Sequence, residues 1–142
     1  MFKYVKRITS LMKIYIAAKF EKKDLVLALR QQLEVLGHTI SYDWTTHKNV
    51  KPYVENKDMA KSYATNEIEG IAKSDIFIHF AEDRGHTLHM ECGAAMMSQK
   101  ITGKPKVFVV GEWNASSPWY FTELVERVGT VEDVVEKIKQ LE

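Results

Sequence analysis

The chain has 142 residues and a mass of 16.4 kDa, a length typical of one domain. Hydrophobic residues make up 45% of it and charged residues 27%, which excludes an intrinsically disordered protein. Lys and Arg number 20 and Asp and Glu 19, a net charge of +1, so the whole molecule has no strong electrostatic attraction to a nucleic-acid polymer or an anionic membrane.

The cysteine content and the N-terminal residues indicate the cellular setting. Cys92 is the only cysteine, so no internal disulfide forms and a reducing, cytoplasmic setting is expected. No apolar run approaches the roughly 20 residues that span a membrane. Residues 1–12 are basic and lack the apolar core of a secretory signal. We interpret them as an N-terminal extension, with an internal start at Met12 left open, and residues 13–142 as a single domain.

The first half of the chain alternates short apolar runs with helical periodicity. Residues 13–18 predict a buried strand. The helix that follows has leucines at helical spacing and ends at Gly37, which suits the left-handed turn after a helix. Alternation over 38–44 predicts a second strand, residues 45–56 form a polar loop, and residues 57–72 predict a helix. The inward stripe expected on that helix consists of Ala60, Ala64, Ile68 and Ile71.

The second half repeats the alternation. A third strand is predicted over 75–80 and a helix rich in small residues and methionine over 87–100. Residues 106–110 predict a fourth strand, residues 125–128 a short fifth, and Thr130 the cap of a last helix.

This order predicts an α/β fold: a doubly wound, flavodoxin-like, mostly parallel sheet of four to five strands with helices on both faces. In such sheets ligands bind beyond the carboxyl ends of the strands. Function is therefore expected on the loops that follow the strands, which are residues 17–23, 43–56, 80–87 and 111–121.

Glu91 is the first candidate for chemistry, because it follows the third strand. If Thr87 caps the helix, Glu91 lies near the end of its first turn, where the helix dipole favours the ionised carboxylate by roughly 0.3–1 kcal/mol. A carboxylate that is charged near neutral pH is suited to act as a nucleophile. The alternative is that Glu91 only stabilises the helix, and position alone favours that alternative.

Three further residues have both a structural and a functional interpretation. Glu67 falls at the edge of the inward stripe, where it either extends to water or is paired or functional. Tyr15 in the first strand either packs in the core or presents its hydroxyl to a carboxylate. Asp75 is interpreted as a turn residue that holds backbone N–H groups.

Several common sites are not predicted. His86, His89 and Cys92 are spaced three apart, which matches no common zinc pattern, and we expect neither a metal nor a cofactor. No glycine-rich dinucleotide motif, Walker-A loop or Gly-x-Ser-x-Gly elbow is present. Lys19, Lys22 and Lys23 follow the first strand, where a solvated basic turn is favoured over a phosphate site.

Three segments in order suggest a family. Residues 14–20 (IYIAAKF) resemble the opening strand and loop of the nucleoside 2-deoxyribosyltransferase family. Residues 66–75 (NEIEGIAKSD) resemble its second motif, and residues 89–95 (HMECGAA) its third, in which Glu-x-Gly carries the nucleophile. The related nucleoside 5′-monophosphate N-glycosidases share this set. The resemblance covers roughly residues 13–110.

The resemblance implies an enzyme that cleaves or transfers the N-glycosidic bond of a (deoxy)nucleoside or its 5′-monophosphate. Glu91 would attack C1′ to form a covalent glycosyl-enzyme intermediate, as in a retaining glycosidase. Glu67 takes the place of the family's Asp that contacts or protonates the base, and Tyr15 matches the tyrosine that orients the nucleophile. The substrate-binding candidates are Ala17, Ala18, Lys19, Phe20, Asp43, Asp83, Gly85, His86, Thr87 and His89.

The sequence departs from the family pattern in three places. Glu67 is one methylene longer than the family's Asp, which matters for a group whose placement is critical. The transferases carry an additional Asp shortly before the nucleophile, where this chain has residues 83–86 (DRGH). The Ser or Arg in the phosphate loop of the monophosphate hydrolases is replaced by residues 17–19 (AAK), which leaves the phosphate state of the substrate open.

Two other questions stay open at this level. The alternative function is a non-catalytic nucleotide-binding module on the same fold, whereas a flavin-binding or phospho-receiver domain is disfavoured by the loops. The expected partner is a small nucleoside or nucleotide, with no nucleic-acid polymer and no membrane. The helix over 87–100, with its small residues and methionines, and the family resemblance favour a homodimer or larger homo-oligomer.

Overall fold

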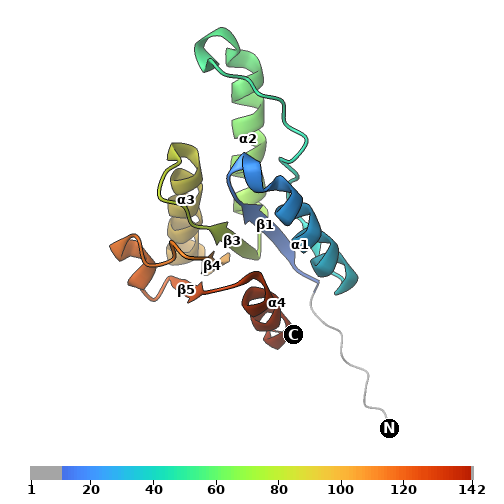
Figure 1. Cartoon of the computed structure of the whole chain (residues 1–142), viewed down its shortest axis with the longest axis vertical. Coiled ribbons are helices and arrows are strands. Elements are labelled where there is room, and N and C mark those ends of the chain that lie inside the picture. The colour runs from blue at the N-terminus through green and yellow to red at the C-terminus, as the bar shows by residue number, and fades with distance from the viewer. Residues whose placement is uncertain (1–10, 142) are drawn as a thin grey trace.

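The computed structural model describes residues 11–141 and contains one five-stranded sheet with the order β2-β1-β3-β4-β5 (Figure 1). All four strand pairs are parallel. The strands are β1 (Lys13–Ala17), β2 (Thr39–Ile40), β3 (Ile76–Phe80), β4 (Lys106–Val110) and β5 (Val125–Val128).

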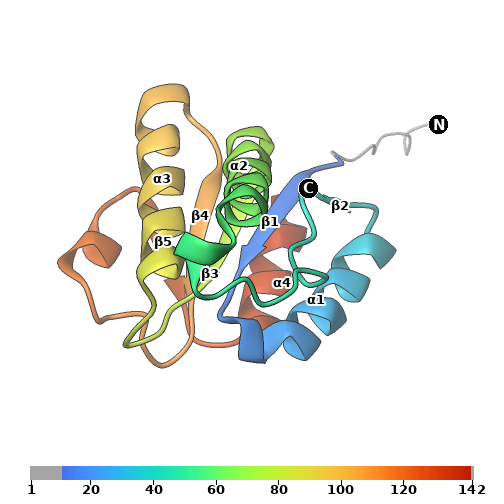
Figure 2. The same cartoon turned by 90° about the horizontal axis from the view of Figure 1, so that it is seen from above.

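Four α-helices cover the sheet, and Figure 2 shows α2 and α3 on one face with α1 and α4 on the other. The α-helices are α1 (Lys23–Val35), α2 (Lys57–Lys73), α3 (His86–Thr102) and α4 (Val131–Gln140). Short 3-10 turns are η1 (Phe20–Lys22), η2 (Tyr53–Glu55) and η3 (Pro118–Phe121). The predicted doubly wound α/β fold with helices on both faces is confirmed. Within residues 11–141, no helix is long and apolar enough to cross a membrane.

The N-terminal extension predicted over 1–12 lies largely outside the described residues. Within it, Met12 packs against the core, and its carbonyl accepts a hydrogen bond from the Thr39 N–H at 3.0 Å.

The core lies on both faces of the three central strands. Every residue of β3 is buried, as are four of the five in β1 and in β4, because helices cover both faces of a parallel sheet of this kind. Tyr15 on β1 stacks on its register partner Phe77, with ring centroids 5.5 Å apart.

The second strand is much shorter than the 38–44 segment predicted for it. Only Thr39 and Ile40 pair with β1. Further along, the indole N–H of Trp44 donates to the carbonyl of Ile16 at 2.6 Å. A side chain thus satisfies the acceptor that a longer β2 would have paired, and the backbone from Tyr42 onward is free to turn toward α2.

The inward stripe predicted for α2 is wrong in two of its four members. Ile71 is buried and Ala60 is half-buried, but Ala64 is exposed and Ile68 is 65% exposed. The side that faces the protein carries Tyr63, Glu67 and Gly70 instead. The cause is that α2 contacts β1 and α3 while its first turns project beyond the sheet (Figure 1), so the apolar periodicity along its full length does not report a buried face.

The start of α3 also differs from the prediction. Thr87 does not cap the helix, because α3 begins at His86 after Gly85, whose φ is +108° and which offers no side-chain cap. Glu91 consequently lies in the second turn, where the helix dipole is weaker than at the first. The dipole therefore does not set the ionisation of Glu91.

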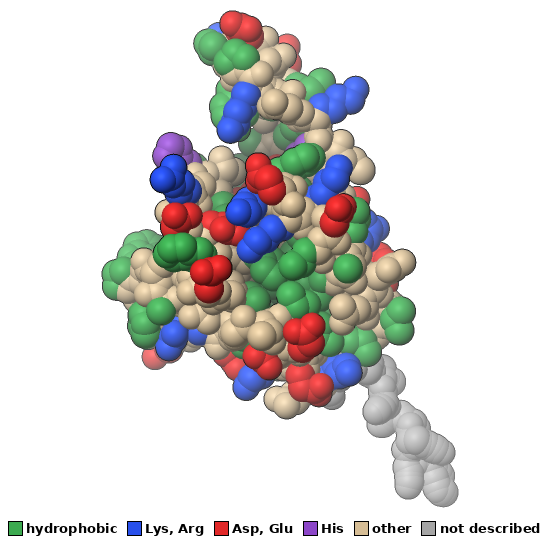
Figure 3. Space-filling model, viewed as in Figure 1, with side chains coloured by type: hydrophobic (Ala, Val, Ile, Leu, Met, Phe, Trp, Pro, Cys, Tyr) green, Lys and Arg blue, Asp and Glu red, His purple; other side chains and the backbone are tan. Residues whose placement is uncertain are grey.

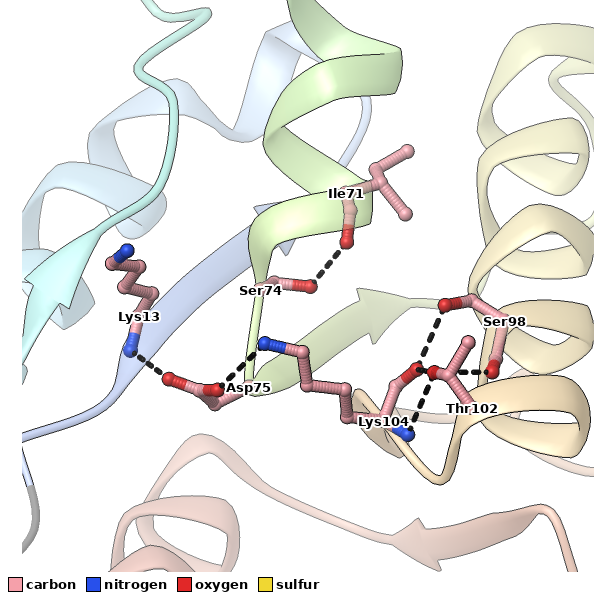
Figure 4. A network of polar contacts seen from close by, with 7 residues as sticks. All are labelled: Lys13, Ile71, Ser74, Asp75, Ser98, Thr102 and Lys104. Carbon is pink, nitrogen blue, oxygen red and sulfur yellow. Dashed lines mark hydrogen bonds and ion pairs between the residues drawn. The ribbon is translucent and has the colours of Figure 1, made fainter.

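Asp75 has the structural role predicted for it, at the edge of the sheet opposite the strand carboxyl ends (Figure 4). Its carboxylate accepts a hydrogen bond from the Lys13 N–H at 2.9 Å and lies 3.4 Å from the Lys104 ammonium. Lys104 in turn is held through its carbonyl by the Ser98 and Thr102 hydroxyls at the end of α3. One side chain thus joins the starts of β1 and β3 to the α3–β4 turn.

A glycine sets how closely α2 approaches the sheet. A Cβ at Gly70 would lie 2.6 Å from the Cβ of Tyr42 and 3.2 Å from the ring of Tyr15. Side-chain carbons do not approach this closely, so only glycine allows α2 to rest on β1 and on the segment after β2 at this point.

We predict that Gly70→Ala lowers the free energy of unfolding by about 1–3 kcal/mol through overpacking, even though alanine favours a helix by about 1 kcal/mol. Urea denaturation measures the change. The matched control is Gly93→Ala on α3, where a Cβ would meet no atom within 4 Å, and which is expected to be neutral or stabilising. Equal effects of the two substitutions would contradict the close approach.

Candidate active site

The structure brings Tyr15, Glu67 and Glu91 together, from β1, α2 and α3 respectively. Glu91 lies on the side of α3 that faces α2, and both carboxyl groups are half-buried. Burial raises the pKa of Glu91 well above its ordinary value, and the charge of Glu67 and a hydrogen bond with Glu67 raise it further. The two carboxyls are thus in direct contact and share a site that disfavours two negative charges.

The hydroxyl of Tyr15 completes this group. Tyr15 is fully buried, and its burial, with the nearby charges of Glu91 and Glu67, raises its pKa far above the usual range, so it stays protonated. Its hydroxyl makes no hydrogen bond of ordinary geometry, yet it lies close enough to Glu91 to lower the pKa of that carboxyl. Tyr15 therefore favours the charged form of Glu91, against the effect of burial.

His47 is a member of the site that the sequence did not reveal. Its Nδ1 lies 3.4 Å from a Glu67 oxygen, and its Nε2 lies 2.6 Å from the Tyr42 hydroxyl. Its ring stacks on Tyr63 of α2, with centroids 3.7 Å apart. No periodicity marks a loop histidine, so only the three-dimensional fold could place it beside Glu67.

The charge state of His47 follows from its surroundings. Burial lowers its pKa, while the charges of Glu67 and Asp43 oppose that effect, so the imidazole is neutral at neutral pH. In the tautomer in which Nε2 accepts from the Tyr42 hydroxyl, the proton of the neutral ring is on Nδ1 and faces Glu67. His47 can therefore hold one oxygen of Glu67 while the carboxyl still contacts Glu91.

The predicted substrate-binding residues of the β1–α1 loop lie at the carboxyl edge of the sheet. Ala17 ends β1 and is buried, Ala18 is half-buried, and Lys19 and Phe20 are more exposed. Lys19 lies 3.6 Å from a carboxylate oxygen of Glu82. Glu82 follows β3 and was not among the predicted site residues.

The remaining candidates are Asp43 and a group around the start of α3. Burial opposes ionisation of the Asp43 carboxyl, but hydrogen bonds from Thr45 and from Arg30, 3.0 Å away, outweigh burial and lower its pKa. His89 is half-buried, with its ring 5.9 Å from that of His79. The candidates ahead of and within the first turn of α3 are all exposed, namely Asp83, Gly85, His86 and Thr87.

Cys92, next to the carboxyl pair, is not placed for nucleophilic chemistry. Burial, and to a smaller extent the charge of Glu91, raises the pKa of its thiol to about 12. Among residues 11–141, no group of three or more His, Cys, Asp or Glu side chains is arranged to hold a metal ion.

An open pocket of about 750 Å³ lies on the other side of α3, against the β4–β5 connection. Its lining combines aromatic and apolar side chains, among them Trp113, Trp119, Tyr120 and Met96, with the polar side chains of Glu82, Asp83, His89, Ser116 and Ser117. Glu91, Glu67 and Tyr15 do not line it. The pocket is therefore lined by two of the predicted substrate-binding residues, Asp83 and His89, and by neither carboxyl of the pair.

Comparison with solved structures gives the fold an independent reference. The CMP N-glycosidase BcmB of Clostridium botulinum aligns with a TM-score of 0.63 and 16% sequence identity, over 92% of this chain and 99% of that one. No protein-family model matches the chain, and a search of curated proteins found no match. The structural likeness shows a shared fold and agrees with the resemblance that the three sequence motifs indicate.

The raised pKa of Glu91 predicts how stability depends on pH. Because the folded protein holds this proton more tightly than the unfolded chain, unfolding releases it, and stability falls as pH rises through the range above the ordinary carboxyl pKa. Glu91→Gln removes this cost. We expect the variant to be more stable than the native protein at pH 8, by at least about 1 kcal/mol, and the gain to vanish toward pH 4.

Thermal unfolding between pH 4 and 8 measures this difference. Glu69→Gln, an exposed position on α2, is the control and should show no pH-dependent gain. A difference between Glu91→Gln and the native protein that is constant with pH would contradict the buried carboxyl pair.

Proposed function

We propose that this protein cleaves or transfers the N-glycosidic bond of a (deoxy)nucleoside or its 5′-monophosphate, with Glu91 as the nucleophile. The observation that carries the proposal is the contact between the Glu91 and Glu67 carboxyls, with the Tyr15 hydroxyl close to Glu91. A pair of carboxyls that shares one proton supplies both a nucleophile and an acid. The fold shared with an N-glycosidase supports this choice.

The first step forms a covalent intermediate. In the reactive form the shared proton lies on Glu67 and Glu91 is charged, a state that the Tyr15 hydroxyl favours. A Glu91 oxygen bonds to C1′ as the bond from C1′ to the base nitrogen breaks. The electron pair of that bond stays on the base, which takes the proton from Glu67.

The second step restores the enzyme. Glu67, now a carboxylate, accepts a proton from water as the water oxygen bonds to C1′ and the ester to Glu91 breaks. If a second base attacks in place of water, the same step transfers the sugar. The two outcomes differ in how well water is excluded from the intermediate. We place the activity in the cytoplasm, because the single cysteine is buried as a free thiol.

His47 is assigned a positioning role in this scheme. Glu67 contacts Glu91 in the free protein, so the two carboxyls must separate to admit the C1′–base bond. The His47 Nδ1, 3.4 Å from a Glu67 oxygen, offers the carboxyl a second partner and keeps it oriented as it moves. Stacking on Tyr63 and the contact with Tyr42 fix the ring in turn.

The function is tested with a panel of ribonucleosides, deoxynucleosides and their 5′-monophosphates, with and without an acceptor base. We expect chromatography to show free base or base exchange for at least one member. Glu91→Ala should lower the rate by about 1000-fold or more, as for other nucleophile removals. Mass spectrometry should find one sugar attached to the native protein and none on the variant.

Two outcomes of that panel would count against the proposal. Turnover by Glu91→Ala at the native rate would remove Glu91 from the mechanism. Stabilisation by nucleotides without any turnover would favour the alternative, a non-catalytic nucleotide-binding module.

We also propose that the chain forms a homodimer through α3. Opposite its sheet-facing side, α3 carries an exposed apolar stripe of Met90, Ala94, Met97 and Ile101, in which the three larger residues are 71%, 49% and 75% exposed. The spacing of four, three and four residues is that of a helix-pairing seam. In an antiparallel pair Met90 meets Ile101 of the partner subunit and Ala94 meets Met97 of the partner subunit, and each contact occurs twice, as in an isologous interface.

We expect sedimentation or light scattering to find a dimer at micromolar concentration and Met97→Glu to convert it to a monomer, because the substitution buries a charge at the seam. Met59→Glu, at an exposed position in the first turn of α2, is the matched control and should leave the dimer intact. A native monomer, or equal effects of the two substitutions, would contradict the proposed interface.

A further inference from the structure

The crevice between the ends of β1 and β3 is the point where the fold changes direction. β1 leads into α1 on one face of the sheet, and β3 leads into α3 on the other. Ligands of doubly wound sheets bind at such a switch point. The charges that face this crevice therefore determine whether a charged or an uncharged group of the substrate can bind there.

Glu82 spans this crevice. It is the second residue after β3, and its side chain is only 9% exposed. Lys22 lies 2.8 Å from one of its oxygens, and Lys19 lies 3.6 Å from the other. Both lysines come from the segment after β1, so a single buried carboxylate joins the two sides of the crevice.

This arrangement leaves the crevice unsuited to a phosphate. The two ammonium groups that a phosphate would use already have an internal carboxylate partner. A phosphomonoester carries a charge between −1.5 and −2 near neutral pH, and it would lie beside the buried negative charge of Glu82, which it repels. Arg84 in the same loop gives no compensation within the crevice, because its side chain is 92% exposed.

A hydroxyl, unlike a phosphate, is attracted to the Glu82 carboxylate. It donates a hydrogen bond to a carboxylate and brings no charge of its own. Glu82 lies in the loop that leads into α3, which carries Glu91, and Lys19 lies in the loop that follows β1, which carries Tyr15. A sugar whose C1′ faces Glu91 therefore has its other end available to the crevice between these segments.

We propose that Glu82 is a specificity-determining residue that accepts a hydrogen bond from a free 5′-hydroxyl and rejects a 5′-phosphate, so that the substrates are nucleosides and not nucleoside 5′-monophosphates. This inference rests on the proposed function for its substrate class. It separates the chain from the structural neighbour, whose name states that it acts on CMP.

The first test compares kcat/KM for each processed nucleoside with that for its 5′-monophosphate. We expect the native protein to favour the nucleoside at least tenfold, and Glu82→Gln to shift the ratio at least tenfold toward the monophosphate, because the lysines then lack their partner. Glu21→Gln, an exposed carboxyl next to Lys22, removes the same charge and should leave the ratio within twofold. A native preference for the monophosphate, or equal shifts in both variants, would overturn the proposal.

The second test does not depend on turnover. We expect 2-deoxyribose 5-phosphate to raise the Tm of Glu82→Gln but not that of the native protein. If no nucleoside or nucleotide is processed, the proposed function fails, while this gain of sugar-phosphate binding would still support the role of Glu82. A folded Glu82→Gln that gains no stabilisation would overturn it. If that variant does not fold, the double variant Lys22→Gln, Glu82→Gln removes both partners together and should likewise lose discrimination against the sugar phosphate.

Discussion

The contact between the Glu67 and Glu91 carboxyls is the constraint around which the rest of the structure is arranged. Two carboxylates that share a half-buried site cannot both be charged without a large cost. The neighbouring side chains reduce that cost in a different way at each carboxyl. Tyr15 favours a charge on Glu91, and the neutral His47 ring contacts Glu67. The two carboxyls thus share one proton, which either of them can hold.

The shape of α2 determines where Glu67 lies. Only the part of the helix near Gly70 rests closely on the sheet, since the first turns project beyond it. Glu67 precedes Gly70 by less than one helical turn, so the close approach at the glycine fixes the depth of the carboxyl. The space-filling view in Figure 3 shows the projecting end of the molecule carrying charged and apolar side chains together, as expected of an end that lies beyond the sheet.

Sequence patterns correctly predicted the strands whose apolar residues are mostly buried. The strands over 106–110 and 125–128 match the structure at both ends, because apolar β-branched runs and flanking turns report burial directly. The predicted length of β2 was wrong because the indole N–H of Trp44 takes the place of backbone pairing. The predicted inward stripe of α2 was wrong because the first turns of the helix project beyond the sheet. The motifs located Tyr15, Glu67 and Glu91, but their contact, the raised pKa of Glu91 and the presence of His47 arise from packing between segments distant in sequence.

The network around Asp75 has a consequence for how such a protein could be altered. Asp75 ties the starts of three neighbouring strands to one residue, through its own backbone contacts with Lys13 and Lys106 as well as through its carboxylate. Strand alignment is therefore secured at the edge remote from the carboxyl pair and from Glu82. Loops at the opposite edge can be exchanged without loosening that alignment, which makes the chain a scaffold for redesigning sugar or base recognition while the sheet is kept unchanged.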